Sequence, residues 1–157
     1  MRARHELYVT RGLYFLGHRG QAWPGPAREP GTEGQLLHRD ANGGGGIAID
    51  CGTFDGPVDL TVETFDERPA ERPDGEWEYD EELESVSTGR DVIVGALEEV
   101  EHAFPVLPVG PDDRYGVRIL ARGVRGAADE GELDLDAEPI EHHYIQLWPV
   151  TRENVAV

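Results

Sequence analysis

The chain has 157 residues and a formal net charge of −18 at pH 7, with 32 acidic residues against 14 basic ones. A surface of this charge repels nucleic acid and anionic membranes, so neither is an expected partner, whereas basic proteins and cations are favoured. The length corresponds to one domain, and we expect residues 1–157 to form a single unit. A single cysteine excludes an internal disulfide, and no apolar run is long enough for a secretory signal or a membrane span. These features predict a cytoplasmic protein.

The first third of the chain contains one predicted strand and one predicted loop. Residues 6–16 have the aromatic and β-branched content of a strand. Residues 17–46 contain nine glycines and three prolines, which interrupt helices and central strands. The sequence therefore predicts a long Gly/Pro-rich loop at 17–46, and loops of this length are usually functional or disordered.

A β-hairpin is predicted next. Its strands are residues 47–51 and 58–65, and a turn rich in glycine and proline joins them. The second strand alternates between apolar and polar residues, which is typical of a strand with one buried and one solvated face. The expected buried residues are Val58, Leu60 and Val62, and the expected solvated residues are Asp59, Thr61 and Glu63.

The second half of the chain is predicted to contain mostly short strands. They are expected at residues 76–88, 92–94, 114–122 and 141–148, with an edge or crossing piece at 104–108, one or two helical turns at 96–103 and an acidic loop at 123–139. In the strand 114–122 we expect a buried face of Tyr115, Val117, Ile119 and Ala121, opposite Arg114, Arg118 and Arg122. About seven to eight short strands and at most one short helix predict an all-β fold, a single-domain antiparallel β-sandwich.

Two segments concentrate the negative charge. Residues 63–84 hold eleven carboxylates against two arginines, and residues 129–141 hold seven more carboxylates. One interpretation is a solubilising surface. The other is a negative platform that docks a basic protein or mimics nucleic acid in front of a nuclease, because charge complementarity accelerates association. In the second case the expected partner-binding residues are Glu78, Asp80, Glu81, Glu82, Asp134 and Asp136.

Trp23 lies inside the Gly/Pro-rich loop, and a large aromatic side chain is unusual in an otherwise polar loop. It either pins the loop to the sandwich or anchors a partner, because buried tryptophans often dominate interface energetics. We include Trp23 among the expected partner-binding residues.

Catalytic and metal-binding motifs are not evident in the sequence. His142 and His143 are neighbours in an expected strand, so their side chains point to opposite faces and cannot hold one ion together. The acidic neighbours of Cys51 raise the pKa of a thiol rather than lower it, which indicates a structural cysteine. Neither a nucleophile elbow nor a phosphate-binding loop is present. We therefore expect no catalytic residue, no metal site and no cofactor.

Several stretches carry a resemblance to known proteins. They are the opening strand 7–15, the loop with Trp23, the strand at 46–49, the run 58–63, the run 115–123 and the closing run 143–149. This order resembles small β-sandwich proteins of actinobacteria and, more distantly, the competence protein J family, inhibitors of a DNA-entry nuclease. The resemblance covers nearly the whole chain but carries no site signature. It implies an acidic, non-catalytic inhibitor or immunity-type protein.

The leading hypothesis is therefore a binding protein that docks a basic partner of nuclease or toxin type. The alternatives are an enzyme or small-ligand-binding sandwich with a pocket under the 17–46 loop, and a structural or assembly protein. The oligomeric state has no sequence signal.

Overall fold

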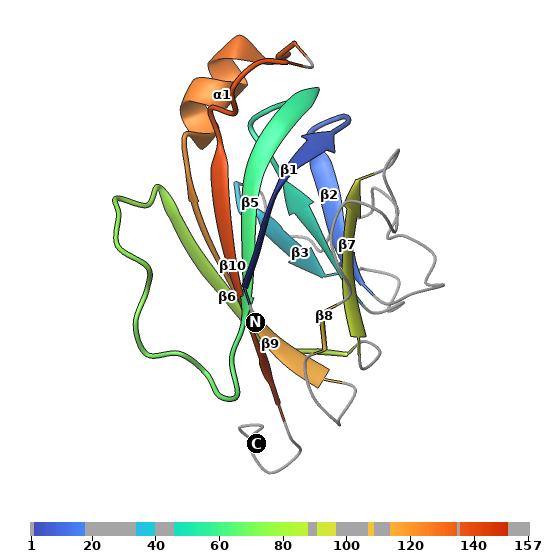
Figure 1. The fold of residues 1–157 in the computed structure, drawn as a ribbon, viewed down its shortest axis with the longest axis vertical. Coiled ribbons are helices and arrows are strands. Elements are labelled where there is room, and N and C mark those ends of the chain that lie inside the picture. Colours follow the sequence, from blue (N-terminus) through green and yellow to red (C-terminus); the bar gives the residue numbers. More distant parts are fainter. Residues whose placement is uncertain are drawn as a thin grey trace.

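Two five-stranded β-sheets face each other across one hydrophobic core (Figure 1). The computed structural model describes residues 2–17, 34–39, 46–87, 91–96, 107–108, 114–134 and 136–150. The first sheet has the strand order β1-β5-β10-β9-β6, and the second has the order β3-β4-β2-β7-β8. The predicted all-β sandwich is confirmed, with ten strands among the described residues rather than seven to eight.

The elements have the following bounds. The first sheet contains β1 (Arg2–Val9), β5 (Gly56–Thr64), β10 (His142–Pro149), β9 (Arg114–Arg122) and β6 (Tyr79–Ser87). The second sheet contains β3 (Leu37–Arg39), β4 (Ile47–Asp50), β2 (Leu13–Gly17), β7 (Asp91–Ala96) and β8 (Leu107–Pro108). The helix α1 (Val124–Glu130) lies at one end of the sandwich, at the top of Figure 1.

The predicted hairpin of residues 47–51 and 58–65 is wrong. β4 pairs with β2 and β3 in the second sheet, whereas β5 pairs with β1 and β10 in the first. The turn between β4 and β5 therefore carries the chain across the core from one sheet to the other. The β5–β10 pair is parallel, so the first sheet is not wholly antiparallel. Alternation identifies a strand and its inward face, but it does not identify the partner.

The inward faces follow the predicted pattern, and the outward faces do not. Val58, Leu60 and Val62 of β5 lie in the core, as do the four inward residues of β9. However, Asp59, Thr61 and Arg118, all expected to face water, are buried as well. Over Arg118 the cause is the 65–78 connection, which returns across the sheet and places the Pro69 carbonyl 3.0 Å from the Arg118 guanidinium.

Two predicted loops contain regular structure. β3 lies within the range 17–46 as an edge strand, so this range is not loop throughout, and residues 18–33 and 40–45 lie outside the described residues. α1 lies within the predicted acidic loop 123–139. The helical turns expected at 96–103 fall almost entirely outside the described residues. Within the described parts of the chain, no helix is long and apolar enough to cross a membrane.

Close contacts between backbones hold α1 against the sandwich. The helix buries Val124 and Ala127. A Cβ atom at Gly52 would lie only 2.0 Å from the Val124 carbonyl oxygen, so only glycine allows this approach. The position of α1 therefore depends on packing against the β4–β5 connection.

Candidate partner-binding surface

Glu78 is bound to the start of α1. Its carboxylate accepts hydrogen bonds from the backbone N–H groups of Gly123 at 2.7 Å and Arg125 at 3.3 Å. These N–H groups have no partner within the helix, and a negative charge beside them is stabilised by the helix dipole. Glu78 therefore caps α1 although it lies far away in the sequence.

Glu81 joins the two sheets. From β6, its carboxylate accepts hydrogen bonds from the backbone N–H of Leu36 at 2.9 Å and of Leu37 at 3.0 Å, at the beginning of β3. Asp80, its neighbour in β6, pairs with Arg72 at 2.7 Å. Glu81 thus contacts a segment distant in sequence, whereas Asp80 contacts the connection that precedes its own strand.

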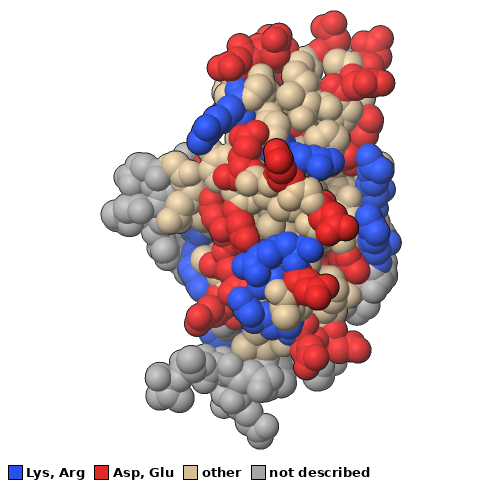
Figure 2. Space-filling view, turned by 90° about the vertical axis from the view of Figure 1, so that its left-hand side faces the viewer, with Lys and Arg blue, Asp and Glu red and all other residues tan. Residues whose placement is uncertain are grey.

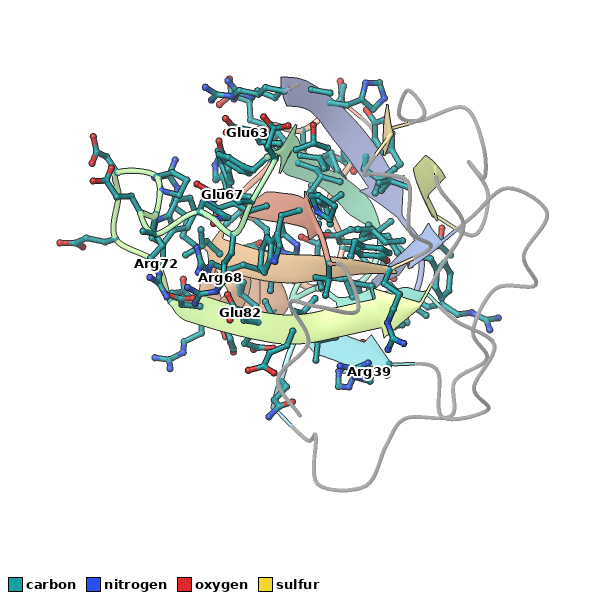
Figure 3. The ribbon with its side chains drawn as sticks, turned by 90° about the horizontal axis from the view of Figure 1, so that it is seen from below. Arg39, Glu63, Glu67, Arg68, Arg72 and Glu82 are labelled. Atoms are coloured by element: carbon teal, nitrogen blue, oxygen red, sulfur yellow. The ribbon has the colours of Figure 1, made fainter. Side chains whose placement is uncertain are left out.

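Glu82 compensates a buried arginine. It accepts a hydrogen bond from Arg118 Nη2 at 2.9 Å and a pair of hydrogen bonds from Arg68 at 3.0 and 3.2 Å. The Arg118 side chain is fully buried and donates a further hydrogen bond to Gln146 at 2.8 Å. Burial and the nearby Arg72 lower the pKa of Arg118, whereas Glu82 raises it. The Glu82 carboxylate therefore stabilises the positive charge of the buried guanidinium. Figure 3 shows Arg68 and Arg72 reaching from the 65–78 connection toward Glu82.

We call Glu78, Asp80, Glu81 and Glu82 the braced acids, because each has a partner inside the molecule. All four were predicted to bind a partner, and the structure gives all four a contact that supports the fold. Arg68 and Arg72 were the sequence signal for the contacts of Glu82 and Asp80, whereas the backbone contacts of Glu78 and Glu81 had none.

Six other carboxylates gather at the α1 end of the molecule and form what we call the acidic end. They are Asp129, Glu130, Glu132, Asp134, Asp136 and Glu138. All six are exposed, and none makes a side-chain hydrogen bond or ion pair with another described residue. Figure 2 shows acidic side chains crowding this upper end, while acidic and basic side chains alternate over the middle of the same face.

The negative charge of the acidic end does not stabilise the fold. Asp129 and Glu130 are the last two residues of α1, and no basic residue lies in the last turn. Carboxylates at a helix C-terminus oppose the helix dipole and cost stability. Residues 124–138 contain only one arginine, Arg125, against the six carboxylates. Predicted residues Asp134 and Asp136 belong to this surface, whereas Trp23 lies outside the described residues.

A cleft of about 210 Å³ lies on the outer face of the first sheet. Asp59 lies inside it between two partners, Arg4 at 2.7 Å and His142 at 2.8 Å. Burial alone would raise the pKa of Asp59, but hydrogen bonds from Arg4 and His142 lower it. Among the described residues that line the cleft there is no serine or cysteine. The pocket that the sequence alternative placed under the 17–46 loop stays a prediction, because residues 18–33 and 40–45 lie outside the described residues.

A second group of ionisable side chains lies inside the sandwich, where the sequence indicated no site. Cys51, Glu141 and His143 each place a potential ligand atom within 4.8 Å of the other two. Glu141 and His143 are hydrogen-bonded to each other, and both side chains are fully buried. His142 points to the outer face and His143 to the core, so the prediction that they point apart is confirmed. The sequence signal for this group is the Glu-x-His spacing, which places the side chains of residues 141 and 143 on the same side of a strand.

Comparisons with known proteins support the fold and assign no family. No family model matches the chain, and no curated protein matches its sequence. Two solved structures share the architecture. One is ComJ from Bacillus subtilis, an inhibitor of the DNA-degrading activity of NucA, with a TM-score of 0.58, 8% identity, and coverage of 94% of this chain and 96% of ComJ. The other is the crocagin biosynthetic gene J product, with a TM-score of 0.55, 15% identity, and coverage of 95% and 98%. The chain thus has a ComJ-like fold over almost its full length.

Proposed function

We propose that this protein is a non-catalytic binding protein whose acidic end docks a basic protein of nuclease or toxin type. The observation that carries the proposal is the set of six exposed carboxylates of the acidic end, none of which is paired with another described residue and two of which end α1. Charge that opposes the helix dipole lowers stability, so its concentration there favours a role outside the fold. A basic partner supplies the missing compensation.

The ComJ-like fold supports an inhibitor-type role, since ComJ itself inhibits a nuclease. At 8% identity this support concerns the architecture, and the choice of surface rests on the charges of this chain. A one-sided acidic surface steers a basic partner and raises its association rate, which suits an inhibitor that must intercept an enzyme quickly.

The acidic end is a better docking surface than the acidic connection at 66–76. Arg68 and Arg72 lie within that connection, and Arg122 stacks over Trp77 at 5.3 Å on the same face. These cations break up the negative field, as the alternating colours in the middle of Figure 2 show. Trp23, which lies outside the described residues, is retained in the proposal as a second contact, an aromatic anchor for the partner.

The test is an inhibition assay with purified basic nucleases and toxins encoded beside the gene. We expect one of them to lose its DNA-degrading or toxic activity at an equimolar amount of this protein. Inhibition should weaken steeply as salt rises to about 0.5 M, because exposed charges are screened beyond a Debye length of ~10 Å at 0.1 M. Inhibition that does not change with salt would contradict docking through the acidic end.

A further inference from the structure

The buried group around Glu141 and His143 has the composition and arrangement of a metal site. Cys51 follows β4 in the second sheet, Glu141 precedes β10, and His143 lies within β10 in the first sheet. A thiolate, an imidazole and a carboxylate are the three ligand types that Zn²⁺ uses in proteins. We propose that Cys51 Sγ, Glu141 and His143 Nε2 bind one Zn²⁺ ion that joins the two sheets.

The distances suit one ion. Zinc bonds of about 2.0–2.3 Å place tetrahedral ligand atoms roughly 3.5 Å apart. The three candidate atoms already lie within 4.8 Å of one another, so side-chain rotations close the remaining gap. The partly exposed Cys51 gives the ion a route from solvent, and a water molecule completes the tetrahedron.

The surrounding hydrogen bonds are those of a supported metal site. The Tyr14 hydroxyl lies 2.7 Å from His143 Nδ1 and accepts its N–H when Nε2 binds the ion. Thr53 donates to Glu141 Oε1 from its backbone N–H at 2.8 Å and from its hydroxyl at 3.1 Å. The other carboxylate oxygen, which now contacts His143, is left for the metal. Each buried ligand therefore has a group that fixes its orientation.

Charge balance favours the ion. Glu141 carries its carboxylate into a fully buried position, and burying a charge is costly unless it is compensated. A divalent ion with one thiolate, one carboxylate and a neutral imidazole makes a neutral unit. Because a cysteine binds metal as the thiolate, Zn²⁺ binding releases the Cys51 thiol proton into solvent.

Cobalt titration of the tag-free chain is the direct test. The chain contains one cysteine, so a thiolate-to-cobalt charge-transfer band reports Cys51 alone. We expect this band together with the visible bands of tetrahedral Co²⁺, both saturating at one equivalent and both abolished by one equivalent of Zn²⁺. Excess Mg²⁺ occupies the surface carboxylates and should leave the signal unchanged.

Variants separate the site from the acidic surface. Cys51→Ser should abolish the charge-transfer band and weaken Zn²⁺ binding by more than about 100-fold, and Tyr14→Phe should weaken it by roughly 10-fold. His142→Gln is the matched control for His143→Gln. The control removes the neighbouring imidazole on the outer face and should bind Zn²⁺ as tightly as the parent does. Zn²⁺ should also raise the melting temperature of the parent and not that of Cys51→Ser. Absence of the charge-transfer band, or Zn²⁺ affinity unchanged in Cys51→Ser, would overturn the proposal.

Discussion

The braced acids and the acidic end carry the same kind of charge and have different consequences. Glu78, Asp80, Glu81 and Glu82 each bind an arginine or a backbone N–H group in another segment. The carboxylates of the acidic end have no such partner among the described residues. Charge density alone therefore does not identify a binding surface. What distinguishes the two regions is whether the molecule itself already compensates the charge.

The largest difference should appear in stability. The quadruple variant Glu78→Gln, Asp80→Asn, Glu81→Gln and Glu82→Gln should lower the free energy of unfolding by on the order of 3–5 kcal/mol. It leaves the buried Arg118 without its carboxylate and removes charged acceptors from backbone N–H groups. Urea unfolding followed by circular dichroism measures the change.

The matched variant removes four charges from the acidic end instead: Asp129→Asn, Glu130→Gln, Asp134→Asn and Asp136→Asn. Its free energy of unfolding should stay within about 0.5 kcal/mol of the parent or rise slightly, because exposed unpaired charges contribute little to stability. Equal losses in the two quadruple variants would remove the distinction between the regions.

The two glycines that flank α1 test how the acidic end is held in place. Both have a positive φ, 72° at Gly123 and 74° at Gly131. A Cβ atom at Gly123 would lie 2.1 Å from the Ile140 carbonyl oxygen, whereas nothing lies within 4 Å at Gly131. Gly131→Ala should cost about 1–2 kcal/mol from the backbone conformation alone, and Gly123→Ala should cost clearly more in the same urea titration. Similar costs at both positions would show that α1 is not packed as closely as described.

Asp59 gives a smaller effect that depends on pH. Its pKa is lowered in the folded protein, despite the opposing effect of burial, because Arg4 and His142 bind the carboxylate. The resulting stabilisation is fully present above the unfolded pKa of about 3.9 and is lost as pH falls through the lower, folded value. Thermal unfolding should therefore separate the parent from Asp59→Asn at neutral pH and bring them together in acid. A difference in melting temperature between the two proteins that grows in acid would contradict this prediction, because it would mean that folding raises the pKa of Asp59.

The sequence located most strands but not their pairing, and the single strand predicted at 6–16 is wrong, because β1 and β2 lie in different sheets. Alternation in 58–65 and 114–122 located β5 and β9 and their inward residues. It could not show that β4 and β5 lie in different sheets, because a short turn joins strands within a sheet or between sheets equally well. Nor could it show that the 65–78 connection covers Arg118, since that contact joins residues 49 positions apart.

For the candidate sites the sequence located charge but not its compensation. Asp134 and Asp136 lie in the exposed acidic end, while Glu78, Glu81 and Glu82 bind groups that are distant in sequence and Asp80 pairs with the nearby Arg72. The cluster of Cys51, Glu141 and His143 was missed because 88 positions separate the Thr53 backbone from the carboxylate it binds. Only the Glu-x-His spacing pointed to it.

The central claim is that the acidic end, rather than net charge, docks the partner. The most direct measurement compares association rates with the inhibited nuclease or toxin for two variants that each lose six carboxylates to the matching amides. One variant changes Asp129, Glu130, Glu132, Asp134, Asp136 and Glu138, and the other changes Asp66, Glu67, Glu71, Asp74, Glu76 and Glu84. At low salt we predict that the first variant associates at least ~10-fold more slowly than the parent and that the second stays within about 3-fold. Equal slowing in both variants would contradict the account.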